Sequence, residues 1–107
     1  MKIGSKTLGA EHPTYFIADI AANHDGNLER ALELMTLAAS AGADAAKFQH
    51  FRADHIVSDK GFRELGGQQS HQSSWSKSVH EVYHDASLPW EWTKPLADHA
   101  KAIGIDF

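Results

Sequence analysis

The chain contains no cysteine, no strongly basic segment and no long apolar run. Without cysteine it has no disulfide framework and no thiolate metal site, which suits a cytoplasmic protein. Its apolar runs fall well short of the ~20 residues that cross a bilayer, and its first residues lack the apolar core of a signal peptide. Its formal charge of −4 comes without a Lys- or Arg-rich stripe. We therefore expect neither a membrane nor a nucleic acid as a partner.

What the chain does have is enough apolar content for one small core. Its 107 residues include 42% hydrophobic side chains, and this length fits a single small domain. Eight histidines are an unusually high number for this length.

The order of the apolar segments predicts an α/β fold. Residues 15–20 (YFIADI) and 45–49 (AAKFQ) are short apolar runs of the kind found in strands that are buried on both faces. Between them, residues 28–41 carry apolar side chains at helical spacing. Asn27 suits the helix N-cap, and Gly42 suits the left-handed position after the helix. Strand, helix and strand at this spacing predict a βαβ unit with parallel strands.

The N-terminal residues and the middle of the chain have a less regular apolar pattern. Residues 1–14 predict a small hairpin, and residues 15–107 form the βα units. Residues 52–88 are rich in Gly, Ser and Gln and predict a long excursion, with a short helix at residues 78–84.

The last segment predicts a second long helix and a further strand. The helix begins near residues 91–93, because Pro95 is tolerated only in a first turn, and it ends before Gly104. Residues 105–107 (IDF) read as the start of a third strand. Since two and a half βα units cannot close a barrel or complete a doubly wound sheet, we expect the chain to be part of a longer protein.

Polar residues inside the two predicted strands mark the candidate site. Side chains alternate between faces along a strand, so Lys47 and Gln49 share one face, and Asp19 can lie on the same side of the sheet. All three stand toward the carboxyl ends of their strands, where parallel α/β folds place their active sites. A buried lysine is costly unless it meets an anion, which Asp19 or a phosphate or carboxylate ligand could supply. The alternative reading is a structural Asp–Lys pair.

The segment PTYFIADIAANHDGNLERALELMTLAASAGADAAKFQHF resembles the opening of the sialic acid synthase family, the N-acetylneuraminate synthases. Two motifs carry the resemblance, namely N-H-x-G and G-A-D-A-x-K-F-Q at this spacing, and the late GIDF also fits. The resemblance implies that the chain is the N-terminal portion of a (β/α)8 TIM barrel in a homodimeric enzyme. It implies condensation of phosphoenolpyruvate with an N-acetylated amino sugar such as N-acetylmannosamine, to form a nonulosonic acid. It does not name the sugar.

The resemblance also implies roles for individual residues. Lys47 matches the lysine that holds phosphoenolpyruvate, and Gln49 matches a glutamine that contacts the sugar. Asp19 takes the place of the usual glutamate, which is one methylene longer, and is a candidate catalytic residue together with Lys47. Asn23 matches the loop after the first strand. We favour a role for it in the backbone geometry of this loop, and substrate contact is the alternative. His50 follows the second strand and is a further candidate substrate contact, with a solvated loop histidine as the alternative.

The family implies a divalent metal ion, Mn²⁺ or Mg²⁺, that polarises the aldehyde of the sugar as a Lewis acid. The family's metal-binding histidines stand on later strands, so we expect the ligands to lie outside this chain. This chain by itself is therefore expected to be inactive.

Two other functions stay open at this point. His80, Glu81 and His84 form an H-E-x-x-H pattern, which on a helix binds zinc in metalloproteases. Chance matches are common in a histidine-rich chain, and no second motif supports this one. The second open alternative is that the chain is a non-catalytic interaction module that folds against a partner.

Overall fold

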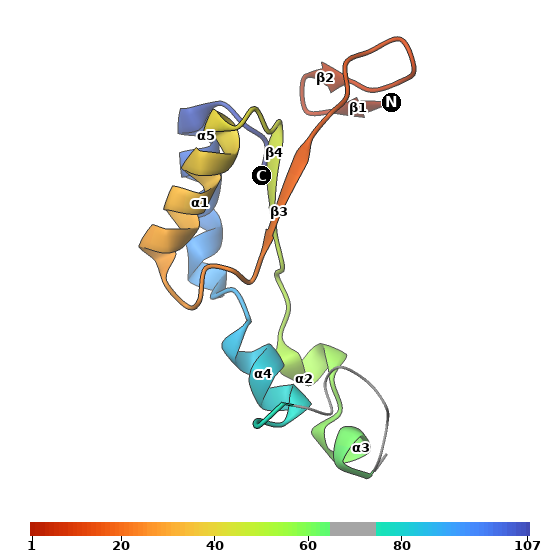
Figure 1. Cartoon of the computed structure of the whole chain (residues 1–107), viewed down its shortest axis with the longest axis vertical. Coiled ribbons are helices and arrows are strands. Elements are labelled where there is room, and N and C mark those ends of the chain that lie inside the picture. The colour runs from red at the N-terminus through yellow and green to blue at the C-terminus, as the bar shows by residue number, and fades with distance from the viewer. Residues whose placement is uncertain (65–74) are drawn as a thin grey trace.

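Two parallel strands with helices on one side form the centre of the molecule. The computed structural model describes residues 1–64 and 75–107. Strand β3 (Ile17–Ala21) pairs in parallel with β4 (Ala45–Phe48), and helix α1 (Leu28–Ser40) connects them. Figure 1 shows α1 and α5 (Thr93–Ile103) together on the same side of these strands. The predicted βαβ unit and α/β architecture are confirmed.

Helix α1 begins and ends where its sequence predicts. The Asn27 side chain accepts a hydrogen bond from the backbone N–H of Arg30, at 3.0 Å between Oδ1 and N. At the other end, Gly42 adopts a φ of +90°, a region that residues with a Cβ rarely occupy. Ala31 and Met35 of the predicted stripe are completely buried, while Leu37 on the opposite side is largely exposed.

The core lies between the sheet and the two long helices. Ile20, Ala46 and Phe48 point into it from the strands. The helices and the segment before η2 (Trp90–Trp92) contribute the other buried members of this cluster, which are Ala31, Met35, Leu88, Leu96 and Ala100. Strand alternation would place Phe16 on the helix-facing side with Ile20, but Phe16 precedes β3 and is 61% exposed. The alternation rule fails there because residue 16 lies outside the strand.

The last residues add one parallel bridge rather than a full strand. Asp106 bridges to Ala45 through hydrogen bonds from its N–H to the Asp44 carbonyl (2.9 Å) and from the Ala46 N–H to its own carbonyl (3.0 Å). Gly104 ends α5 with a φ of +80°, as the sequence predicts. Of the predicted third strand, the described residues form only this single bridge to β4.

The N-terminal hairpin docks onto the amino ends of these strands. β1 (Lys2–Ile3) pairs with β2 (Lys6–Thr7) in an antiparallel ladder. Lys6 donates to Asp44 (2.5 Å), and the Tyr15 hydroxyl donates to Asp106 (2.5 Å). Burial and the Asp106 hydrogen bond raise the pKa of Tyr15 to about 12. The hydrogen bond from Lys6, and then that from the Phe16 N–H, lowers the pKa of Asp44.

The excursion after β4 contains more helix than expected. α2 (Ala53–Ile56) and α3 (Asp59–Glu64) were predicted as loop, whereas α4 (Val79–Asp85) was predicted at nearly these bounds. A ring contact between Phe51 and Tyr83 (centroids 5.6 Å apart) joins the start of the excursion to α4. Helices this short depend on packing rather than on an apolar periodicity, which is why the sequence did not reveal them. Residues 65–74 of the predicted excursion lie outside the described residues.

No helix in residues 1–64 or 75–107 is both long and apolar enough to span a membrane.

The N-cap of α1 gives a direct test of the helix boundary. We expect Asn27→Ala to lower the free energy of unfolding by about 1 kcal/mol, because the N–H that Asn27 caps loses its partner. Asn27→Asp retains an acceptor oxygen and should stay close to the wild type. Urea unfolding followed by circular dichroism measures both. Equal losses in the two variants would contradict the cap.

Candidate functional site

Strands β3 and β4 bring Asp19 and Lys47 together on one face of the sheet. The two residues are Cα partners in the parallel register, and Nζ of Lys47 donates to Oδ2 of Asp19 at 2.7 Å. Ile20, Ala46 and Phe48 are buried in the core with the helices, so the ion pair lies on the opposite face. The predicted sharing of a face by Asp19 and Lys47 is confirmed.

The expectation that Lys47 is buried is wrong for the described residues. The Lys47 and Asp19 side chains are 53% and 55% exposed, respectively. Helices cover one face of the two-stranded sheet, and the polar face remains open to solvent. Because an exposed ammonium keeps much of its hydration, Lys47 does not need an anion for the fold to be stable. An ion pair this exposed stabilises a fold by about 0–1 kcal/mol.

The other candidate residues occupy the loops after the strands. Gln49 directly follows β4 and is exposed. The Asn23 amide donates to the Ile20 carbonyl at 2.9 Å, which supports the predicted backbone role. The His50 ring lies 2.9 Å from the Thr93 hydroxyl, measured from Nε2 to Oγ1, and contacts the rings of Trp90 and Phe107. His50 thus joins the end of β4 to the start of α5.

The structure gives His24 a buried position that the sequence did not indicate. It is completely buried, between Phe48 (ring centroids 6.5 Å apart) and Trp92 (5.4 Å, edge to face). Nδ1 accepts the Gly26 N–H at 3.1 Å, so the neutral ring carries its proton on Nε2. That nitrogen has no hydrogen-bond partner within residues 1–64 and 75–107. Burial lowers the pKa of His24 below 6.5, and nearby Asp25 opposes the shift.

Residues of the H-E-x-x-H segment form hydrogen bonds that stabilise the local structure. The Glu81 carboxylate accepts the Ser78 N–H (2.8 Å), and the Ser78 hydroxyl accepts the Glu81 N–H (3.2 Å), which together make a capping box for α4. His80 Nε2 lies 2.6 Å from the Asp54 carboxylate, and the hydrogen bond lowers the pKa of Asp54. Within the described ranges, no three His, Asp or Glu side chains are placed to hold a metal ion. The arrangement of Glu81 and His80 does not support the zinc protease alternative.

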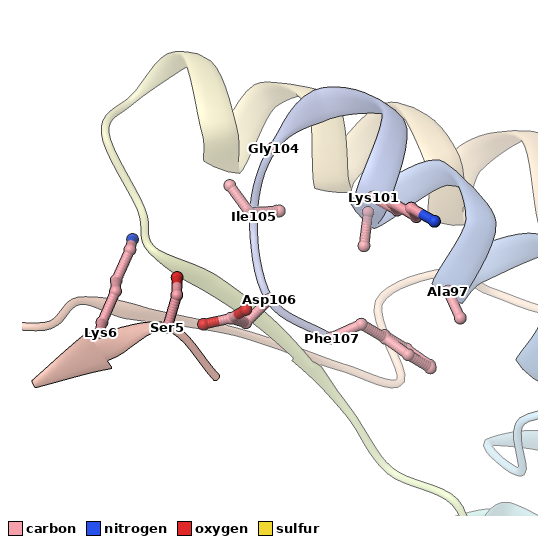
Figure 2. A pocket seen from close by; sticks show the side chains of 9 residues that line it. Ser5, Lys6, Ala97, Lys101, Gly104, Ile105, Asp106 and Phe107 are labelled. Atoms are coloured by element: carbon pink, nitrogen blue, oxygen red, sulfur yellow. The ribbon is translucent and has the colours of Figure 1, made fainter. Parts of the chain in front are cut away.

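A pocket of about 320 Å³ opens at the other end of the sheet. Figure 2 shows it between the hairpin, represented by Ser5 and Lys6, and the end of α5 with Lys101, above Asp106 and Phe107. Asp106 bridges to the first residue of β4, so the pocket lies at the amino end of the strands. Parallel α/β folds place their active sites at the carboxyl end, and Asp19 and Lys47 are not among its lining residues. We therefore assign the candidate site to the ion pair.

A family model described as the NeuB family matches residues 34–107, which is more than half of the chain. The chain belongs to the NeuB family. The matched residues include Lys47, Gln49 and His50, whereas Asp19 and Asn23 precede them. The family resemblance that the motifs predicted is therefore confirmed.

The curated relatives of this NeuB chain include a spore-coat protein and proteins named as synthases. It is 35% identical over 106 residues to the spore coat polysaccharide biosynthesis protein SpsE of Bacillus subtilis, covering 99% of this chain and 27% of the relative. It is 36% identical over 109 residues to a pseudaminic acid synthase of Campylobacter jejuni, covering 98% and 29%. It is 30% identical over 100 residues to the human N-acetylneuraminate-9-phosphate synthase, covering 94% and 27%. The chain thus spans well under half the length of these relatives.

Solved structures agree with this NeuB assignment. The crystal structure of SpsE from B. subtilis matches with a TM-score of 0.67 at 33% identity, covering 98% of this chain and 25% of that one. The N-acetylneuraminic acid synthetase of Leptospira borgpetersenii matches with a TM-score of 0.71 at 23% identity, covering 98% and 31%. At that identity the second match shows the fold alone.

The burial of His24 predicts a dependence of stability on pH. Because the folded state lowers the pKa of His24, the unfolded chain takes up the proton first as the pH falls below about 6.5. The His24 contribution to the free energy of unfolding is therefore complete above that pH and is lost as the pH falls through the folded pKa. His24→Leu should show a shallower pH dependence in urea unfolding between pH 7.5 and 5, values that bracket the ordinary pKa of about 6.5.

The matched control is His12→Leu, since His12 is exposed on the hairpin segment. This variant should keep the wild-type slope. If His24→Leu and the wild type lost stability in parallel as the pH fell, the neutral, buried state of His24 would be contradicted.

Proposed function

We propose that this chain is the N-terminal part of a (β/α)8-barrel synthase that condenses phosphoenolpyruvate with an N-acetylated amino sugar to form a nonulosonic acid. The observation that carries the proposal is the Lys47 ammonium. It stands on the helix-free face of two parallel strands, toward their carboxyl ends, in a chain of the NeuB family. The relatives of this chain include pseudaminic and legionaminic acid synthases, and this supports the proposed class of reaction.

In this proposal Lys47 binds the anionic donor. An ammonium group has three N–H donors, and the hydrogen bond to Asp19 uses one of them. The same ammonium can donate to a phosphate or carboxylate oxygen, and such charge-assisted hydrogen bonds are about twice as strong as neutral ones. Gln49, which directly follows the strand, supplies an amide with two donors and an acceptor for the sugar. Asn23 and His50 hold the loops around the site through their hydrogen bonds, and contact of either residue with the substrate stays a prediction.

The proposed reaction forms one carbon–carbon bond. C3 of phosphoenolpyruvate attacks the aldehyde carbon of the open-chain sugar, water adds at C2, and phosphate leaves the tetrahedral intermediate. The part of this chemistry that falls to the present residues is to hold the donor by its negative charge. Lys47 does so without moving a proton.

The described residues do not fit the divalent metal ion that the resemblance implies. Across residues 1–64 and 75–107, no cluster of three His, Asp or Glu side chains is placed to coordinate one. We propose that Mn²⁺ or Mg²⁺ takes its ligands from beyond this chain. The homodimer and the cytoplasmic location belong to the same proposal and rest on the family resemblance.

The anion-binding role of Lys47 predicts that its replacement lowers the affinity for phosphoenolpyruvate. Titration of the isotope-labelled chain with phosphoenolpyruvate, followed by amide NMR shifts, should show saturable changes around residues 47–49. Lys47→Gln should weaken this binding about tenfold or more, because a charged hydrogen bond to the ligand is lost. Lys101→Gln removes an exposed cation on α5, which lies on the other side of the sheet, and should leave the affinity unchanged. Equal affinities in wild type and Lys47→Gln would refute the assignment.

A further inference from the structure

The Asp19–Lys47 pair differs in place from the other ion pairs of the described residues. Several of those lie within one helix, such as Lys60–Glu64 and Lys94–Asp98, and Lys6–Asp44 attaches the hairpin. In the part of the chain that the structure describes, only Lys47–Asp19 joins the two strands of the parallel sheet. It is therefore the one of these pairs that occupies the candidate site itself.

Asp19 has two opposite effects on an anion that approaches Lys47. Its hydrogen bond holds Nζ at a fixed point on the sheet (2.7 Å from Oδ2), which reduces the freedom that binding would otherwise remove. Its negative charge, however, occupies the same ammonium and repels the incoming anion. In the 107-residue chain both side chains are about half exposed, and an ion pair this exposed is weak enough to be displaced.

We propose that Asp19 is an internal competitor for Lys47: its carboxylate pairs with the ammonium and gives way, at least in part, to an anion that binds there. This inference rests on the proposed function, in which that anion is phosphoenolpyruvate. Asp19 is then a positioning residue that sets the affinity of the site rather than a group that attacks substrate.

The competition has a consequence for release as well as for binding. When an anion leaves Lys47, the carboxylate is next to the ammonium and takes its place, so the ammonium regains a partner. The affinity for inorganic phosphate, which the proposed reaction releases, is reduced by the same factor as the affinity for the donor. Asp19 thereby lowers the affinity of the site and makes release of the bound anion easier.

The decisive variant is Asp19→Asn. The amide oxygen can still accept the Lys47 hydrogen bond, but the competing charge is gone. For an ion pair of the strength typical of exposed sites, removing the competition should tighten binding roughly two- to sixfold. Amide NMR titrations of the full 107-residue chain with inorganic phosphate and with phosphoenolpyruvate should both show this gain. The gain should shrink as KCl is raised, because salt screens exposed charges.

Asp98→Asn is the matched control. It changes the net charge by the same amount and frees Lys94 from an exposed pair, but it does so on α5. Its affinity for both anions should equal that of the wild type. Asp19→Ala provides a second variant that also removes the charge, should Asp19→Asn fail to show a native circular dichroism spectrum.

The outcomes separate this inference from the proposed function. If Lys47→Gln abolishes anion binding but the Asp19 variants bind no more tightly than the wild type, the competition is wrong and the function stands. A gain in affinity of the same size in Asp98→Asn would show that the effect comes from the net charge alone. This result would also overturn the inference. If binding does not depend on Lys47 at all, the proposed function fails and the competition fails with it.

Discussion

The register between β3 and β4 determines what each side chain of the sheet can do. Because successive residues of a strand point to opposite faces, a slip of one residue would exchange the polar and the apolar faces. The observed pairing of Ile17 with Ala45 and of Asp19 with Lys47 avoids this. Burial of Ala46 and Phe48 under the helices is the interaction that fixes the register, and it places the charges on the open face.

The end of β3 shows how the sheet passes into the loop beside the site. Ala21 pairs with Phe48, so β3 has one residue more than β4 between Asp19 and Ala21. Ala21 adopts a φ of 51°, which is uncommon for a residue with a Cβ. Bulges of this kind redirect a strand and are frequent next to active sites. Directly after it, His24 enters the core between Phe48 and Trp92 and anchors the loop.

Much of this arrangement could be predicted from the sequence because it depends on local periodicity. Helical spacing located α1, and strand alternation together with the known order of active sites in α/β folds selected Asp19 and Lys47. The exposure of Lys47 could not be predicted in this way, since an apolar run indicates burial without saying which face is covered. α2 and α3 have too few turns to show a period. His24 looks like any loop histidine until the contacts with residues 48 and 92 are known, and those contacts are not local.

The docking of the hairpin has a consequence for how the chain acquires its structure. The Tyr15–Asp106 hydrogen bond joins residues that are 91 positions apart, and Lys6–Asp44 joins residues 38 apart. Closing loops of such length costs entropy before any contact compensates for it, and folds rich in distant contacts form slowly. During synthesis on the ribosome, the β1–β2 ladder can close as soon as it emerges. The hydrogen bond between Tyr15 and Asp106 has to wait until nearly all of the 107 residues have left the exit tunnel.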